Sequence, residues 1–313
     1  MKALAGRWFL YGPFIAVGVI LAAWFMLWRS GAALMRDSLD EFEATQKAEG
    51  TIVAYEPLSA RGFPFYLRGA VQNFSVARGD DRYQCAKLFI DALPYAPDRI
   101  IFSCAGDQLL SAAGEVWTIN AKDARASVER DDKRGWLAKI ETGKASAFNN
   151  DIEATLGGAI INIAPGADGA EGVDATMRLT DIGVTRPASG YAVDRIDAAA
   201  TVSGAAGRRI VRLHGLEAVI GDTNLKAEGE IEFPSHEDAR GRLNARVEKP
   251  AGLAQTFSDA GLLGDKDAKT AEAALAMLAV ASGGAIAAPI DIENGEVRLA
   301  GLKIARLKSA GQP

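Results

Sequence analysis

The sequence predicts a mainly β protein: a large curved antiparallel sheet behind one N-terminal transmembrane helix, with a short stalk helix and a helical pair near the C-terminus. Three observations predict it. Residues 8–28 carry no charge, and from residue 51 onward apolar and polar side chains alternate with a period of two. Gly, Asn, Asp or Pro separates most of the alternating segments, as in antiparallel meanders. Because strands do not alternate with long helices, a parallel nucleotide-binding sheet is not expected.

The first element is the run WFLYGPFIAVGVILAAWFMLW, residues 8–28. As a helix it measures about 32 Å at 1.5 Å per residue, enough to cross a bilayer core. Tyr11 lies near one end and Trp24 and Trp28 near the other, where interfacial aromatics are common. A cleaved signal peptide is the alternative, but bulky residues occupy 24–28, where a cleavage site needs small ones.

Charges on either side of this run set the expected orientation. Lys2, Arg7 and the terminal amine precede it, and Arg29 follows it. The excess before the run favours a cytoplasmic N-terminus. We therefore expect a single-pass inner-membrane protein whose main domain lies in the periplasm.

The second element is a stalk helix over residues 30–50. Met35, Leu39, Phe42 and Gln46 follow helical spacing, and Gly50 is a natural stop. This helix is expected to act as a stalk or as a lid on the following sheet. The expected domains are thus an anchor (1–29), the stalk (30–50) and a periplasmic β-rich domain (51–313).

Strands are then expected along most of the remaining chain. Their ranges are 67–77, 115–129, 136–148, 158–164, 172–183, 191–203, 209–220, 223–233, 241–248, 288–294 and 296–304. A helical insertion at 250–283 interrupts them, with its two helices joined around Gly264 and Asp265. The last two strands meet at Asn294-Gly295, the dipeptide preferred in two-residue hairpins.

Cys85 and Cys104 are the two cysteines of the chain. If they lie on adjacent strands, the turn between them is centred between Pro94 and Tyr95, and the register pairs Phe89 with Ile100. Direct opposition would bring the cysteines within disulfide reach. Two unpaired thiols are the alternative. A metal site would need further ligands, and a redox pair usually has the spacing Cys-x-x-Cys. We predict a cross-strand disulfide.

The sequence contains few residues and motifs of the kinds that form catalytic sites. The two histidines, His214 and His236, are far apart, and no nucleophile elbow, P-loop or zinc-protease motif occurs. The net charge of −5, with dispersed Lys and Arg, does not suggest nucleic-acid binding. We expect no enzyme activity, cofactor or metal. Phe63, Phe65 and Tyr66 are unusual because Gly and Pro bracket aromatics ahead of a strand; they are either core residues or docking aromatics.

Several of these motifs resemble the bacterial envelope family known as domain of unknown function DUF2125. The resemblance rests on Gly62-Phe63-Pro64-Phe65, Leu93-Pro94-Tyr95-Ala96-Pro97 and the ending Pro289-Ile290-Asp291-Ile292-Glu293-Asn294-Gly295 with the residues after it. It covers most of the chain after the anchor. It implies an N-terminal anchor and brings no catalytic residues.

A looser similarity is to AsmA-like envelope proteins. It rests on Leu213-x-Gly215, Leu225-x-Ala227-x-Gly229-x-Ile231 and Gly241-Arg242-Leu243-x-Ala245-x-Val247. This similarity implies a membrane-anchored β-rich protein associated with lipid movement. From the anchor, the alternation and the scarcity of catalytic groups, we expect binding of a lipid or apolar segment on a concave sheet face. The alternative is a scaffold that presents a sheet edge or the 250–283 helices to an envelope protein.

Overall fold

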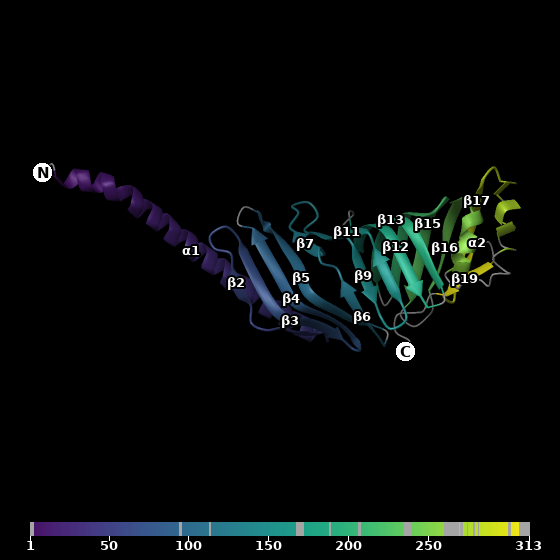
Figure 1. Cartoon of the computed structure of the whole chain (residues 1–313), viewed down its shortest axis with the longest axis horizontal. Coiled ribbons are helices and arrows are strands. Elements are labelled where there is room, and N and C mark those ends of the chain that lie inside the picture. Colours follow the sequence, from purple (N-terminus) through teal and green to yellow (C-terminus); the bar gives the residue numbers. More distant parts are fainter. Residues whose placement is uncertain are drawn as a thin grey trace. The chain divides into compact units, whose positions relative to one another are not determined.

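The computed structural model describes residues 3–93, 96–112, 114–166, 172–187, 189–205, 208–234, 239–259, 269, 272–273, 275–277, 279–280, 282–299 and 302–306. Contacts divide the chain into two units, Met1–Gly114 and Glu115–Pro313. The domain boundaries expected at residues 29 and 50 both fall inside the first unit. Antiparallel strands make up most of the described chain, which confirms the predicted mainly β fold (Figure 1).

The first unit opens with α1 (Ala3–Ala48), a continuous helix that joins the expected anchor and stalk without a break. Its apolar segment is unburied, with Phe14 75% and Ile20 66% exposed. A helix that is apolar all round belongs either in a core or in a membrane. Since this one has no core around it, the exposure fits a membrane anchor. Among the described residues, α1 is the one helix long and apolar enough to span a bilayer.

The described residues of the first unit after α1 form five strands. They are β1 (Ile52–Ala54), β2 (Ser59–Arg61), β3 (Leu67–Arg78), β4 (Asp81–Leu93) and β5 (Ala96–Ala112). β1 and β2 both pair with β3, and β3, β4 and β5 follow as an antiparallel meander.

The C-terminal half of α1 covers one face of this sheet. Met35 and Leu39 pack against the buried cluster of Leu58, Val71 and Ile90. Gly69 lies so close beneath the helix that a Cβ there would stand 2.6 Å from the Met35 sulfur. The Tyr55 hydroxyl also donates to Asp40 at 2.9 Å. Of the two expected roles, this half of the helix therefore acts as the lid, although Phe42 is 44% exposed.

The second unit is a longer meander. Its strands are β6 (Glu115–Asn120), β7 (Arg125–Glu129), β8 (Leu137–Thr142), β9 (Ala145–Phe148), β10 (Glu153–Leu156), β11 (Gly158–Pro165), β12 (Gly172–Arg186), β13 (Ser189–Ala205), β14 (Arg208–Ile220), β15 (Thr223–Pro234), β16 (Arg240–Glu248), β17 (Ala285–Glu293), β18 (Glu296–Leu299) and β19 (Leu302–Arg306). From β11 to β19 each strand pairs antiparallel with the next. β8 pairs with β11, whereas β10 pairs with β9 and with the far end of β12.

Two expected strands are each divided in the structure. Residues 115–129 form β6 and β7, because the chain turns at Lys122 and Asp123, and 136–148 form β8 and β9 around Gly143. The alternating apolar residues change phase at each turn, from Ile119 and Ala121 to Ala124 and Ala126 at the first and from Ile140 to Ala145 at the second, and this change marks the break.

The expected helical insertion is described in part. α2 (Ala251–Asp259) is its first helix, and it buries Leu253 and Ala254 while contacting β13 and β15. The described residues between 269 and 280 are helical, whereas Gly264 and Asp265 lie outside the described residues. The hairpin expected at Asn294-Gly295 is present, with both residues at positive φ and Glu293 opposite Glu296.

Candidate functional site: an apolar sheet face

Side chains on one face of the second unit form continuous apolar rows across the strands. The row through Met177 contains Ile140, Ile161, Met177, Ala198, Leu216, Ala227, Ala245 and Ala288. The next row contains Ala138, Ile163, Ala175, Ala200, Leu213, Gly229, Leu243 and Ile290. We call this surface the apolar face.

Two flanking rows extend the apolar face in both directions along the strands. One contains Val173, Val202, Val211, Ile231, Gly241, Ile292 and Val297. The other contains Leu179, Ile196, Ala218, Leu225, Val247 and Ile286. Every member of these four rows is apolar, so the face is far wider than a single stripe.

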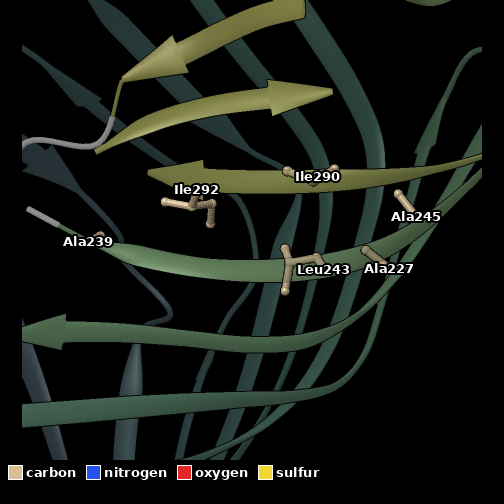
Figure 2. Close-up of a cluster of buried hydrophobic side chains, with 6 residues drawn as sticks. All are labelled: Ala227, Ala239, Leu243, Ala245, Ile290 and Ile292. Atoms are coloured by element: carbon tan, nitrogen blue, oxygen red, sulfur yellow. The ribbon is translucent and has the colours of Figure 1, made fainter. Parts of the chain in front are cut away.

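Burial along the apolar face changes from one end to the other. On β16 and β17, Leu243 and Ile290 are 7% and 8% exposed and belong to one packed cluster. The strands of this cluster are bent (Figure 2). On β12 and β13 the side chains of the same rows are only partly buried. Val202 on β13 is 36% exposed, and Ile140 on β8 is 40% exposed. The face is thus a filled core toward β17 and an accessible apolar surface toward β8.

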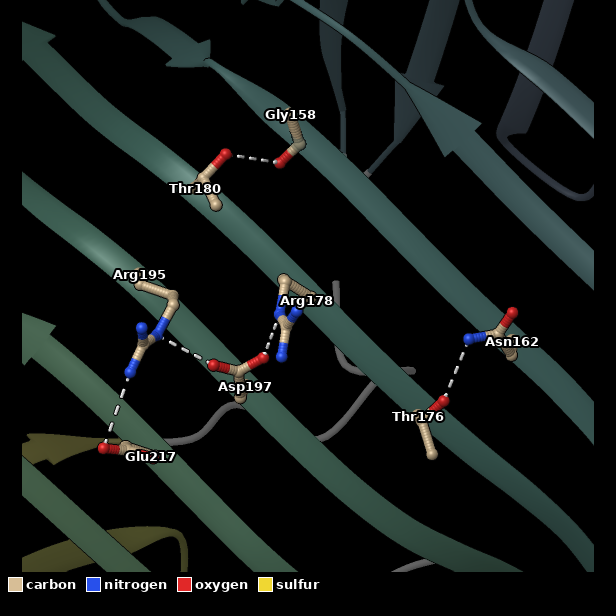
Figure 3. Close-up of polar contacts among 8 residues, drawn as sticks. All are labelled: Gly158, Asn162, Thr176, Arg178, Thr180, Arg195, Asp197 and Glu217. Carbon is tan, nitrogen blue, oxygen red and sulfur yellow. Dashed lines mark hydrogen bonds and ion pairs between the residues drawn. The ribbon is translucent and has the colours of Figure 1, made fainter.

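The opposite face carries charges in register. Arg178 Nε lies 2.5 Å from Asp197, and Arg195 bridges Asp197 at 2.9 Å and Glu217 at 3.6 Å (Figure 3). Asn162 donates to Thr176 at 3.1 Å in the neighbouring row. We call this surface the charged face, and it confirms the expected alternation of one apolar and one wetted side.

An open groove of about 860 Å³ crosses β11 to β17. Its lining combines two rows of the charged face with members of the Met177 row between them. The lining residues are Ile160, Asn162, Thr176, Met177, Arg178, Asp197, Ala198, Ala199, Gly215, Leu216, Glu217, Lys226, Ala227, Glu228, Asn244, Ala245, Arg246 and Ala287. Several of its charges already neutralise one another, and desolvating such pairs is costly. The groove is therefore poorly suited to binding an acyl chain.

Ionisable groups of the charged face have shifted pKa values with simple causes. The hydrogen bond from Lys139, together with Arg125, lowers the pKa of Glu141. The hydrogen bond from Arg240 likewise lowers the pKa of Glu232, with Arg208 adding to it. Both shifts come from ion pairs on an exposed surface, within β8 and with β7 for Glu141 and across strands for Glu232. They keep the carboxylates ionised, so they do not identify a general acid.

His214 takes part in the one arrangement that resembles a catalytic triad among the described residues. Its Nε2 lies 2.7 Å from Thr201 Oγ1, and that hydroxyl donates to Asp174 at 2.7 Å. In a triad the histidine stands between the nucleophile and the carboxylate. Here the threonine stands in the middle and its hydroxyl donates its hydrogen bond to Asp174, so the order of a triad is not reproduced. His236 lies outside the described residues.

Within the described part of the chain, no three His, Cys, Asp or Glu side chains gather in a way that could hold a metal ion. Cys85 and Cys104 form a disulfide with their sulfur atoms 2.01 Å apart and their Cα atoms 6.1 Å apart. The predicted disulfide is confirmed.

The strand register predicted for the cysteines is wrong. Phe89 lies opposite Ser103 rather than Ile100, and Cys104 lies opposite Leu88. Leu93 pairs with Ala96 as expected, but the register shifts by three residues before Ala92 pairs with Ile100. Residues 97–99 are left without partners in β4 by this shift. Pro97 is one of them, and because proline has no N–H for strand pairing, it favours a bulge there. The turn residues Pro94 and Tyr95 themselves lie outside the described residues.

The three predicted docking aromatics lie together in the loop Gly62–Tyr66, against α1. Phe63 packs edge-on against Phe25 and Trp28, with ring centroids 5.4 and 6.0 Å apart. Tyr66 lies 5.6 Å from the Arg68 guanidinium. Phe65 is 80% exposed. Sequence reasoning identified the loop but not its partner, because the contacts join residues about 40 positions apart.

Comparison with known proteins gives one match. A family model described as an uncharacterised protein conserved in bacteria, DUF2125, matches residues 28–308. The match confirms the family resemblance seen in the sequence. No curated protein and no solved structure matches the chain, and the similarity to AsmA-like proteins stays a prediction.

Proposed function

Because this chain belongs to the uncharacterised bacterial family DUF2125, we propose that it is a membrane-anchored, non-enzymatic envelope protein that binds lipid acyl chains on the apolar face. The observation that carries the proposal is the apolar face itself. Four adjacent rows of apolar side chains remain partly exposed on β12 and β13, and a contiguous exposed apolar patch is typical of a binding surface. An acyl chain would remove this surface from water.

The chemistry of β12 and β13 supports an acyl chain as the ligand. Ala175, Ala198 and Ala200 are partly exposed, and Met177 is an adaptable neighbour. At the other end of the face, by contrast, Ala227 and Ala245 are buried in one cluster with Leu243, Ile290 and Ile292.

Two features support the proposed location. The unburied apolar part of α1 supports a single-pass inner-membrane anchor, and the charge order around it favours a cytoplasmic N-terminus. The Cys85–Cys104 disulfide supports a periplasmic site for the rest of the chain, since disulfides persist in oxidising compartments. In that location the inner membrane could supply lipid to the apolar face.

Site-specific photo-crosslinking tests the proposal. The full chain is made in bacteria with benzoylphenylalanine at Met177, on the apolar face, or at Thr176, the adjacent residue on the charged face. After irradiation, the purified protein is analysed for covalently attached phospholipid by mass spectrometry. We expect lipid on the Met177 variant and little on the Thr176 variant. Equal labelling, or none at Met177, would refute acyl-chain binding on this face.

Paired substitutions then separate lipid binding from folding. Ala198→Asp places a carboxylate on the apolar face, and Ala199→Asp places one on the charged face of the same strand. In a Met177 crosslinking background, the first change should abolish lipid capture and the second should leave it in place. Capture that survives Ala198→Asp in a folded protein argues against the proposal.

A scaffold role is the second candidate, and one observation favours it. Met277 and Val280 are 74% and 83% exposed, and both are among the described helical residues, three positions apart in the sequence. Such a pair suits a helix-in-groove contact with an envelope protein. Benzoylphenylalanine at Val280 should then crosslink a protein of discrete mass, and a chain crosslinked only to lipid would exclude this role.

A further inference from the structure

The loop Gly62–Tyr66 is fastened to the end of the uncharged run of α1 by two hydrogen bonds. The Trp24 indole N–H donates to the carbonyl of Pro64 at 2.6 Å, and the Trp28 indole N–H donates to the carbonyl of Tyr66 at 3.0 Å. Trp24 and Trp28 are one helical turn apart and therefore lie on the same side of the helix. Phe65 stands between the two fastened residues.

This attachment fixes the depth of Phe65 relative to the membrane span. Trp24 and Trp28 lie roughly 8 and 2 Å from Arg29 along the helix axis, on the membrane side, at 1.5 Å per residue. The chain around them, Trp24-Phe25-Met26-Leu27-Trp28, is apolar. If the run 8–28 crosses the bilayer, Phe65 lies at the outer boundary of the hydrocarbon core.

Five polar groups of the loop backbone have hydrogen-bond partners. The amides of Phe65 and Tyr66 donate to the carbonyl of Gly62 at 3.0 and 3.1 Å. The carbonyls of Pro64 and Tyr66 accept from the two indoles, and Pro64 has no N–H. Unpaired backbone groups cost several kcal/mol in lipid, so this pairing suits a loop that enters the membrane.

The side chains fit the same environment. Phe65 is 80% exposed although it is apolar, whereas Phe63 is held against Phe25 and Trp28. Tyr66, which has both an apolar ring and a hydroxyl, is typical of the membrane interface. Phe65 is thus an exposed apolar side chain between Phe63 and Tyr66. Its partner should be apolar and should lie beside the membrane-spanning part of α1, and lipid meets both conditions.

We infer that Gly62–Tyr66 is a membrane-inserting loop, with Phe65 embedded in the lipid of the leaflet that surrounds Trp24 and Trp28. The loop holds the first unit against the bilayer at a second point besides the helix itself. This inference rests on α1 as the membrane anchor and is independent of ligand binding on the apolar face.

Fluorescence quenching by brominated lipid tests the inference. The full chain, as parent, Phe65→Trp or Ile52→Trp, is reconstituted in phosphatidylcholine vesicles with or without bromine near the top of the acyl chains. Ile52 is the matched control because it is 67% exposed in the same unit but follows the far end of α1. Subtracting the parent spectrum isolates the emission of the added tryptophan. Quenching of the parent itself reports the anchor.

We expect brominated lipid to remove most of the added emission of Phe65→Trp and to leave that of Ile52→Trp unchanged. Aqueous iodide should show the reverse order. The inference would be overturned if iodide, and not brominated lipid, quenched the added emission of Phe65→Trp. This holds both for a loop that faces water and for a loop that binds a protein partner. If the parent emission is also insensitive to brominated lipid, the anchor itself is wrong.

Discussion

Removal of the Cys85–Cys104 disulfide should destabilise the first unit without affecting the second. The bond joins β4 to β5 across a sequence separation of 19 residues. For a closed loop of about 20 residues, the chain-entropy model gives about 3 kcal/mol of stabilisation at 25 °C. Since 1.4 kcal/mol corresponds to a factor of ten, the unfolded population of the first unit should rise by roughly 10²-fold.

Hydrogen exchange read by mass spectrometry measures this change in each unit separately. In Cys85→Ala/Cys104→Ala, the slowest amides of β3, β4 and β5 should exchange about two orders of magnitude faster than in the parent. Amides of β12 to β16 serve as the internal control, because they belong to the second unit. Reduction of the parent protein should reproduce the change without any substitution.

Two results would contradict this reasoning. Protection of β3 to β5 that changes by less than a few-fold would mean that the strand ladder already restricts the chain as fully as the bond does. Equal loss of protection in both units would mean that they unfold together.

Three further predictions concern single positions. Val71→Ala, at a side chain with no exposed surface, should lower the free energy of unfolding of the first unit by about 2 kcal/mol; denaturant titration measures this, and a loss under 0.5 kcal/mol would contradict the packing of α1 over β3. Gly295→Ala should cost about 1 kcal/mol, because Gly295 has φ 74° in the β17–β18 turn, and faster exchange confined to β17 and β18 is the expected sign. The pKa of Glu232 is lowered by Arg240, so its stabilising contribution is complete above the unfolded pKa of about 4.3 and is lost as pH falls through the lower folded value. Glu232→Gln should therefore reduce the drop in melting temperature between pH 7 and pH 3, and an unchanged drop would show that the pair contributes nothing.

The parts of this fold that depend on local pattern could be predicted from the sequence. Alternation with a period of two located β11 to β16 within a few residues, and Asn294-Gly295 identified the β17–β18 turn. The disulfide was predicted correctly even though its register was not. A register depends on every residue left out of the strand pairing. The segment around Pro97 shifts β5 by three positions directly after the Leu93–Ala96 pair, which was predicted correctly.

Contacts between distant segments could not be predicted in the same way. The Gly62–Tyr66 loop stood out by composition, but only the folded chain shows that Trp24 and Trp28 hold it. The breadth of the apolar face was also hidden, since each strand shows its own alternation while the rows depend on the pairing of all strands together. Strand prediction thus identifies which residues share a face, and register decides whether those faces join into one surface.

The two ends of the apolar face carry the same sequence pattern in two environments, one packed and one accessible. On β16 and β17 the rows contain Leu243, Ile290 and Ile292, which contact one another and complete a core. On β13 the same rows contain Ala198 and Ala200, which remain partly exposed. Alanines occur at both ends, since Ala227 and Ala245 are buried members of the packed cluster, so what changes along the face is coverage by neighbouring side chains rather than polarity or residue size. In the proposed function, a bound acyl chain would supply on β12 and β13 the coverage that Leu243 and Ile290 supply at the other end.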